Sequence, residues 1–150
     1  MGFPYKSILC PIDFDDNSLA ALDQALAMAR HFKARVILVH VVPMVIQFGD
    51  VPLPVELFQE QTKGAKAKLG EIAKAKLGDF EHEAVLYTGD VAGSIVEAIA
   101  KFNPDLVVMA THGRGGFAHL FLGSVTEIVV RKSKSPVLTI RSGQTSPSRK

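Results

Sequence analysis

The residues best suited to chemistry lie in one glycine-bearing segment, residues 110–125. Residues 113–116 include three glycines, which adopt positive φ easily and let backbone N–H groups turn toward an anion. Gly123 and Ser124 then stand directly before a run with helical periodicity. The first N–H groups of a helix have no partner and carry the positive end of its dipole, so they suit a phosphate. The segment therefore predicts a loop that holds the phosphates of a nucleotide.

Ser124 also has a purely structural interpretation. Together with Glu127 it matches an S-x-x-E capping box, in which the serine side chain only satisfies N–H groups of its own helix. The glycines can likewise serve only to turn the chain. The choice between the two interpretations depends on where the fold places this loop.

The surrounding segments alternate between strand and helix patterns. Strands are expected at residues 7–12, 36–42, 83–88, 106–110 and 137–140, where apolar and β-branched residues run together. Helices are expected after capping residues 15–18, from about residue 55 to 77, after Gly89 and Asp90, and from Ser124 onward. A loop rich in proline and glycine is expected between residues 43 and 54.

This alternation predicts an α/β fold with a Rossmann-like architecture. We expect a five-stranded parallel sheet with helices on both faces. Ligands of such sheets bind beyond the carboxyl ends of the strands, where the strand order reverses. Asp13, residues 41–43 and residues 110–124 all follow strands and would meet at this edge. Their position favours the binding interpretation of Ser124.

Length and composition restrict the remaining possibilities. The 150 residues, 47% of them hydrophobic, suit one domain over residues 1–141, and the polar, basic residues 142–150 are expected to be a disordered tail. The net charge of +2 argues neither for nor against a nucleic-acid partner, but no basic block is interleaved with aromatic residues, so none is expected. No apolar run is long enough to cross a membrane, and we expect a cytoplasmic protein.

Two isolated residues receive no catalytic role. The single cysteine, Cys10, lies in an apolar run and is expected to be a buried, unreactive thiol. His40 also falls in an apolar strand, where we expect a core histidine with a hydrogen-bond partner. Neither a Walker-type G-x-x-x-x-G-K-[ST] loop nor a G-x-G-x-x-G motif after the first strand is present.

The glycine spacing resembles that of the universal stress protein family. The nucleotide-binding, ATP-binding branch of that family carries G-x-x-G, nine residues and then G-[ST]. Here the matching residues are Ala110 and Gly113, the nine residues 114–122, and then Gly123 and Ser124. Ala110 replaces the first glycine and adds a methyl group near the phosphates. The resemblance covers about residues 5–141 and implies an adenine nucleotide alpha hydrolase-like fold, a five-stranded parallel sheet with the strand order 3-2-1-4-5.

The resemblance implies how the nucleoside would be held. Val41 would offer its backbone to the adenine edge, and Pro11 and Ile12 would line the pocket. Asp13 would accept hydrogen bonds from the ribose or lie near the phosphate-bound metal. Gly89 matches a loop position close to the nucleoside.

The resemblance also assigns the phosphate site. Met109 and Gly113 would shape the base of the loop, and Gly123, Ser124 and Val125 would bind the phosphates through backbone N–H groups and the Ser124 hydroxyl. The implied cofactor is ATP or AMP, with a divalent metal such as Mg²⁺ at Asp13. Arg114 enters from its charge and location alone: it either neutralises a phosphate or points to solvent.

Three functions remain open. The first is an ATP-binding regulatory protein that signals through its bound state. The second is a slow ATPase or phosphotransferase, for which Asp13, Thr111 and Ser124 are present without a convincing general base. The third is a nucleotide-free interaction module, for which the replacement by Ala110 is the only support. The resemblance further implies a homodimer that pairs the last strand, Pro136 to Arg141, across a two-fold axis.

Overall fold

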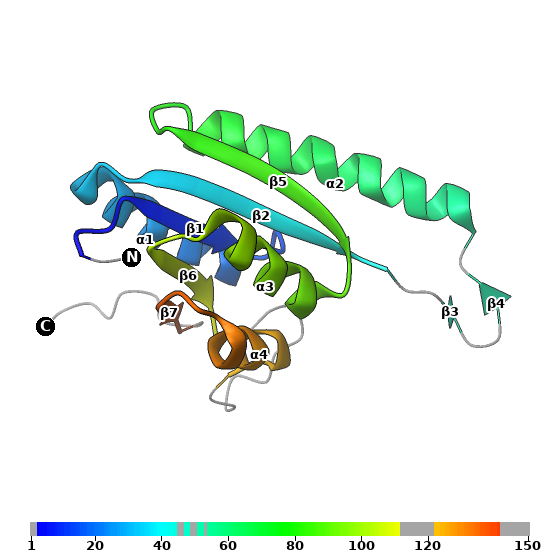
Figure 1. The fold of residues 1–150 in the computed structure, drawn as a ribbon. Helices are drawn as coiled ribbons and strands as arrows, with labels where there is room; N and C mark the ends of the chain where they lie inside the picture. Colours follow the sequence, from blue (N-terminus) through cyan, green and yellow to red (C-terminus); the bar gives the residue numbers. More distant parts are fainter. Residues whose placement is uncertain (1–2, 45–46, 49–50, 53, 112–121, 142–150) are drawn as a thin grey trace, which may run out of the picture.

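The computed structural model describes residues 3–44, 47–48, 51–52, 54–111 and 122–141 (Figure 1). The strands of its main sheet are β1 (Ser7–Pro11), β2 (Arg35–Pro43), β5 (His82–Gly89), β6 (Leu106–Ala110) and β7 (Val137–Ile140). The helices are α1 (Asp16–Phe32), α2 (Val55–Lys76), α3 (Val91–Phe102) and α4 (Ser124–Lys132). The predicted Gly113, Arg114 and residues 142–150 lie outside the described residues.

The sheet has five parallel strands in the order β5-β2-β1-β6-β7. Counted along the chain, this is the predicted order 3-2-1-4-5, which the structure confirms. The chain builds outward from β1 through β2 to β5, and then returns to the other side of β1 for β6 and β7. The order therefore reverses at β1, and the carboxyl ends of all five strands lie at one edge.

Helices cover both faces of the sheet, as the sequence predicts (Figure 1). One face packs with α1 and α2 around buried residues such as Leu22, Leu38 and Leu77. The opposite face packs with α3 and α4 around residues such as Ile37, Ile95 and Val129. Alternate residues of β2 enter the two cores, which explains why its sequence is apolar throughout.

Cys10 lies in the first of these cores with its side chain fully buried. Burial raises the pKa of its thiol from 9.0 to about 12, and the negative charge of Asp23 adds to the rise. The thiolate is the reactive form of cysteine. The predicted burial of Cys10 is therefore confirmed, and its raised pKa favours the less reactive thiol form.

The segment between β2 and α2 differs from the prediction. A loop was expected there, but β3 (Gln47–Phe48) and β4 (Val51–Pro52) form a short antiparallel pair. Strands of two residues are too short for hydrophobic alternation to appear in the sequence.

Among the described residues, no helix is long and apolar enough to cross a membrane.

Candidate functional site

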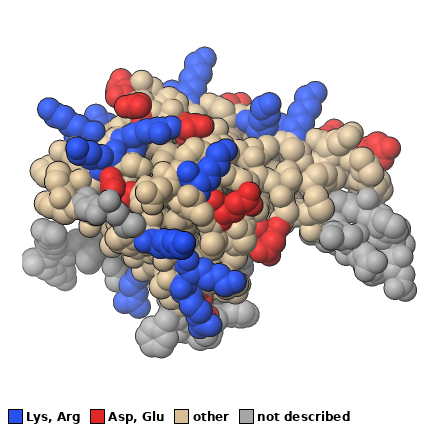
Figure 2. Space-filling view, viewed as in Figure 1, with Lys and Arg blue, Asp and Glu red and all other residues tan. Residues whose placement is uncertain are grey.

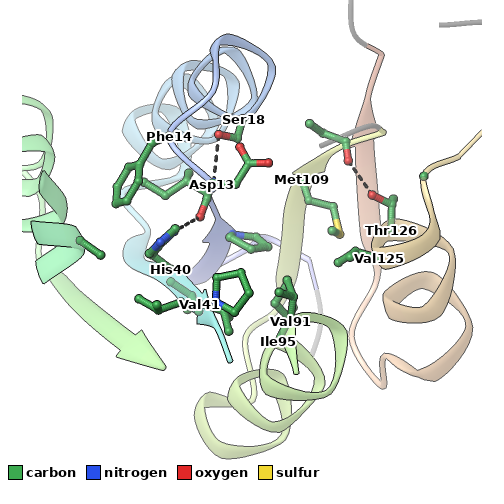
Figure 3. A pocket seen from close by; sticks show the side chains of 18 of the residues that line it. Asp13, Phe14, Ser18, His40, Val41, Val91, Ile95, Met109, Val125 and Thr126 are labelled. Atoms are coloured by element: carbon green, nitrogen blue, oxygen red, sulfur yellow. Dashed lines mark hydrogen bonds between the residues drawn. The ribbon is translucent and has the colours of Figure 1, made fainter. Parts of the chain in front are cut away.

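A cavity of about 860 Å³ opens at the carboxyl edge of the sheet, where the strand order reverses (Figure 3). Its volume lies within the usual range for small-molecule sites. Figure 3 shows Phe14 and His40 on one side of it, Val125 and Thr126 on the other, and Asp13 and Met109 between them. The cavity lies at the edge that the topology predicts for a ligand.

Eight of the eleven predicted site residues line this cavity. They come from β1 and the turn after it, from β2, from β6 and from the start of α4: Pro11, Ile12, Asp13, Val41, Met109, Gly123, Ser124 and Val125. Gly89 ends β5 at a φ of 130° and accepts a hydrogen bond from Met44 N–H at 3.2 Å, but it is not part of the lining. Gly113 and Arg114 lie outside the described residues.

Val41 presents backbone groups to the cavity because β1 is shorter than β2. The ladder between the two strands ends at Pro11 and Val39, and Ile12 N–H donates to Val39 O at 2.8 Å. Successive residues of a strand direct their backbone groups to alternate neighbours, so Val41 faces the same side as Val39. On that side β1 has already ended. The Val41 N–H and C=O therefore suit the donor and acceptor pattern of a planar heterocycle.

Asp13 is held in the turn between β1 and α1. Its N–H donates to Ser18 Oγ at 3.1 Å, and its Oδ1 accepts from Asp15 N–H at 3.2 Å. Asp15 is the N-cap of α1 and accepts from Ser18 N–H at 2.7 Å, as the predicted capping segment requires. Partial burial raises the pKa of Asp15, and its hydrogen bond to the Asp13 side chain raises it further. The turn thus fixes a carboxylate at the mouth of the cavity.

His40, Phe14 and Lys68 lie in contact at one side of the cavity. His40 is buried and its Nδ1 lies 2.7 Å from Ile12 O, which confirms the predicted partner-bonded core histidine. Its ring lies 4.0 Å from that of Phe14, and Lys68 Nζ lies 5.5 Å from the Phe14 ring centroid. Phe14 adopts a φ of 69°, which is rare for an aromatic residue and often marks a functional site.

The start of α4 forms the opposite side of the cavity. Gly123, extended at φ −70° and ψ 162°, is its N-cap, and Gly123 O accepts from Glu127 N–H at 2.9 Å. The predicted capping box is wrong: the N-cap is Gly123, Ser124 is the first residue of the helix, and Glu127 pairs with Arg131 at 2.8 Å. An extended glycine can cap the helix through its carbonyl alone, which leaves the exposed Ser124 hydroxyl outside the cap.

Three N–H groups at this helix start are available to an anion. Gly123 N–H itself donates to Thr111 O at 2.6 Å, so it contributes to the loop rather than to a ligand. The N–H groups of Ser124, Val125 and Thr126 precede the first bond inside the helix and have no intrahelical acceptor. These three residues lie one position further along the chain than the predicted Gly123, Ser124 and Val125.

Among the described residues, no group of three or more His, Cys, Asp or Glu side chains is placed to hold a metal ion. Asp13 can supply one carboxylate to a cation. Mg²⁺ commonly binds one or two protein carboxylates together with phosphate oxygens and water. The arrangement at Asp13 fits a cation that arrives with a phosphate ligand.

Comparison with known proteins identifies the family. Residues 4–141 match the model of the universal stress protein family. This chain belongs to the universal stress protein family. The protein MJ0531 of Methanocaldococcus jannaschii, a universal stress protein, is 36% identical over 143 residues, covering 91% of this chain and 82% of that protein.

Solved structures of universal stress proteins share the fold. UspA from Lactobacillus plantarum superposes with a TM-score of 0.79 at 23% identity, over 91% of this chain and 98% of that one. A universal stress protein in complex with cAMP has a TM-score of 0.68 at 29% identity, over 91% of this chain and 97% of that one. The family resemblance and the Rossmann-like fold are thus confirmed, and membership of the ATP-binding branch stays a prediction.

Several lining residues of this universal stress protein were not predicted. They are held by backbone conformation or by helix packing and carry no motif: Phe14, Ser18, His40, Lys68 and Thr126. Phe14 follows the predicted Asp13 directly, but its positive φ is not encoded by its residue type. Thr126 follows the predicted Ser124 and Val125 directly, and its role becomes evident once α4 is known to begin at Ser124.

Thr126 joins the start of α4 to the end of β6. Its buried Oγ1–H donates to Ala110 O at 2.9 Å (Figure 3). Thr126→Val is expected to lower the free energy of unfolding by about 1–2 kcal/mol, because it leaves a buried carbonyl without its partner. Urea denaturation measures the change, and Thr126→Ser, which keeps the hydroxyl, should retain most of the stability. Equal midpoints for the valine variant and the wild type would show that this bond contributes nothing.

Proposed function

We propose that this universal stress protein binds an adenine nucleotide in the cavity at the carboxyl edge of its sheet. The adenine edge bonds the Val41 backbone, the ribose lies near Asp13, and the phosphates bond the N–H groups of Ser124, Val125 and Thr126. The observation that carries the proposal is the convergence in one cavity of two sets of backbone groups that have no partner among the described residues, at the end of β2 and at the start of α4.

The chemistry of the two sides differs in the way a nucleotide requires. Apart from His40, the β2 side chains that line the cavity are apolar, which suits a base. The α4 side offers three N–H groups and the positive end of a helix dipole, which suits phosphates. The related universal stress protein solved with cAMP supports an adenine nucleotide as the ligand.

ATP or AMP is the ligand that we propose, and a divalent cation such as Mg²⁺ would bind Asp13 together with the phosphates. Bound nucleotide would then act as a regulatory signal to a partner in the cytoplasm. Regulation is preferred to ATP hydrolysis because the residues described around the cavity offer no well-placed general base. The His40 ring packs on Phe14, and its Nδ1 lies at hydrogen-bond distance from Ile12 O.

We also propose a homodimer through the last strand. β7 lies at the edge of the sheet, next to β6 only, and Leu138 is 39% exposed. Ile128 and Val130 on α4 are also exposed apolar residues. Pairing residues 136–141 across a two-fold axis would satisfy the edge of β7. Sedimentation at micromolar concentration should give twice the chain mass, and a monomer mass would contradict the pairing.

Isothermal calorimetry tests nucleotide binding directly. The purified chain is titrated with ATP, AMP, cyclic AMP and adenosine, each with and without Mg²⁺. At least one nucleotide should bind with a submillimolar Kd, and adenosine should bind more weakly because it lacks the phosphates that α4 holds. If no nucleotide binds at submillimolar concentration, the proposal is wrong.

A further inference from the structure

Helix α2 contributes a wall to the cavity that the sequence did not predict. Gln61, Gly64, Ala65 and Lys68 line it, and their spacing of three, four and seven residues places them on one face of the helix. In the sequence the lysines of α2 indicate no more than a solvated surface. Figure 2 shows Lys and Arg side chains over the part of the surface where α2 lies, with acidic side chains among them.

The two halves of α2 have different surroundings. The C-terminal half is anchored, because Leu69 and Ala73 are buried in the core and Lys76 pairs with Asp23 at 2.7 Å. Residues 55–68 include no buried residue. All four lining residues lie within residues 55–68. The face of α2 that they share therefore borders the cavity rather than the core.

Lys68 brings a positive charge to this wall. Its ammonium lies 5.5 Å from the Phe14 ring centroid, and Phe14 follows Asp13 directly. Within the described part of the chain, no carboxylate lies at ion-pair distance from Lys68; the three ion pairs there involve Arg35, Lys76 and Arg131. The charge is therefore available to an anion that enters the cavity.

Gly64 provides room on the same face. A Cβ placed there meets nothing within 4 Å, so a side chain has open space around it at a position that lines the cavity. Gly70 has equally open surroundings but does not line the cavity. The two glycines thus form a matched pair on one helix, since either substitution improves helix propensity and only one adds atoms to the site.

We infer that residues 61–68 of α2 form a wall of the nucleotide site and that Lys68, which lies across the cavity from the start of α4, is a specificity-determining residue that favours ligands with a higher negative charge. The inference rests on the proposed function and extends it beyond the glycine-bearing loop and the β2 backbone. It assigns to this side of the site a steric limit at Gly64 and an electrostatic preference at Lys68.

The steric part is tested with Gly64→Leu and Gly70→Leu. Both variants should melt at or above the wild-type temperature. By calorimetry, Gly64→Leu should bind ATP about tenfold more weakly, because the leucine occupies ligand space, and Gly70→Leu should bind as the wild type does. If Gly64→Leu binds ATP with wild-type affinity, α2 does not form a wall of the nucleotide site at this position.

The electrostatic part is tested with Lys68→Gln and Lys66→Gln, each titrated with ATP, AMP and adenosine. Lys68→Gln should weaken the binding of ATP about threefold or more, the binding of AMP less, and the binding of adenosine not at all. The reason is that the exposed lysine attracts a ligand only in proportion to the negative charge that the ligand carries. Lys66 lies on the same helix but does not line the cavity, so Lys66→Gln should change none of the three affinities. Equal effects of the two variants, or an equal loss for adenosine, overturn the role of Lys68. Absence of binding by the wild-type chain overturns the proposed function as well, whereas normal wild-type binding with unaffected variants overturns only this inference.

Discussion

Ser124→Pro is expected to weaken binding of ATP and AMP by about tenfold or more while leaving α4 folded. Proline at the first helical position removes one N–H group that the helix does not use, and it also removes the serine hydroxyl. The backbone before it already suits proline, since Gly123 is extended at φ −70° and ψ 162°. The substitution therefore removes phosphate donors without breaking the helix.

Calorimetry and circular dichroism separate these two effects. Ser124→Ala is the matched control, because it removes the hydroxyl and keeps the N–H group, and it should lose less affinity than the proline variant. Adenosine, which has no phosphate, should bind all three proteins alike. If Ser124→Pro keeps full affinity for ATP with normal helix content, the phosphates do not bind the start of α4.

Cys10 is expected to make the protein less stable in alkali, by on the order of 4 kcal/mol between pH 9 and 12. Burial and the charge of Asp23 raise the pKa of its thiol from 9.0 to about 12 in the folded chain. The unfolded chain, in which the thiol has its ordinary pKa, loses this proton first as the pH rises. The unfolded state is then favoured above pH 9, and the loss is complete once the pH passes the folded pKa.

Cys10→Ala shows how much of this pH dependence belongs to the thiol. Lysine and tyrosine titrations are common to both proteins, so the difference between their free energies of unfolding reports on Cys10 alone. The variant is less stable at pH 7, because it loses a buried sulfur atom, and its stability should fall less steeply from pH 9 to 12. If urea denaturation shows that the free energies of unfolding of the two proteins depend equally on pH, the thiol pKa is not raised.

Much of the fold follows from hydrophobic pattern. The expected strand at residues 106–110 matches β6 and that at 137–140 matches β7, because each is a short apolar run with clear turn residues around it. The alternation of strands and helices then leads to a parallel sheet whose carboxyl edge binds ligands, whereas the strand order follows from the family resemblance. The pairing of β3 with β4 was not predicted, since two-residue strands carry no periodicity.

The site was predictable only where a motif or a strand end defines it. Val41 and Asp13 follow from the topology and the family resemblance, and both line the cavity. Lys68 is distant in sequence from every motif, and only the packing of α2 places it beside Phe14. Ser124 lies in the cavity as expected, but its role as a cap was wrong, because the carbonyl of Gly123 begins the helix. Such one-residue shifts at helix ends are beyond what residue preference determines.

The most direct test of the nucleotide site is a titration of ¹⁵N-labelled protein with AMP, followed by amide chemical shifts. The proposal predicts the largest changes at Ser124, Val125 and Thr126, where the phosphate binds, and at Val41, where the adenine binds. Amides of Lys33 and Phe80, which border a separate surface pocket, should not move. Saturable shifts confined to that second pocket, or no saturable shifts at all, would contradict a nucleotide site at the carboxyl edge of the sheet.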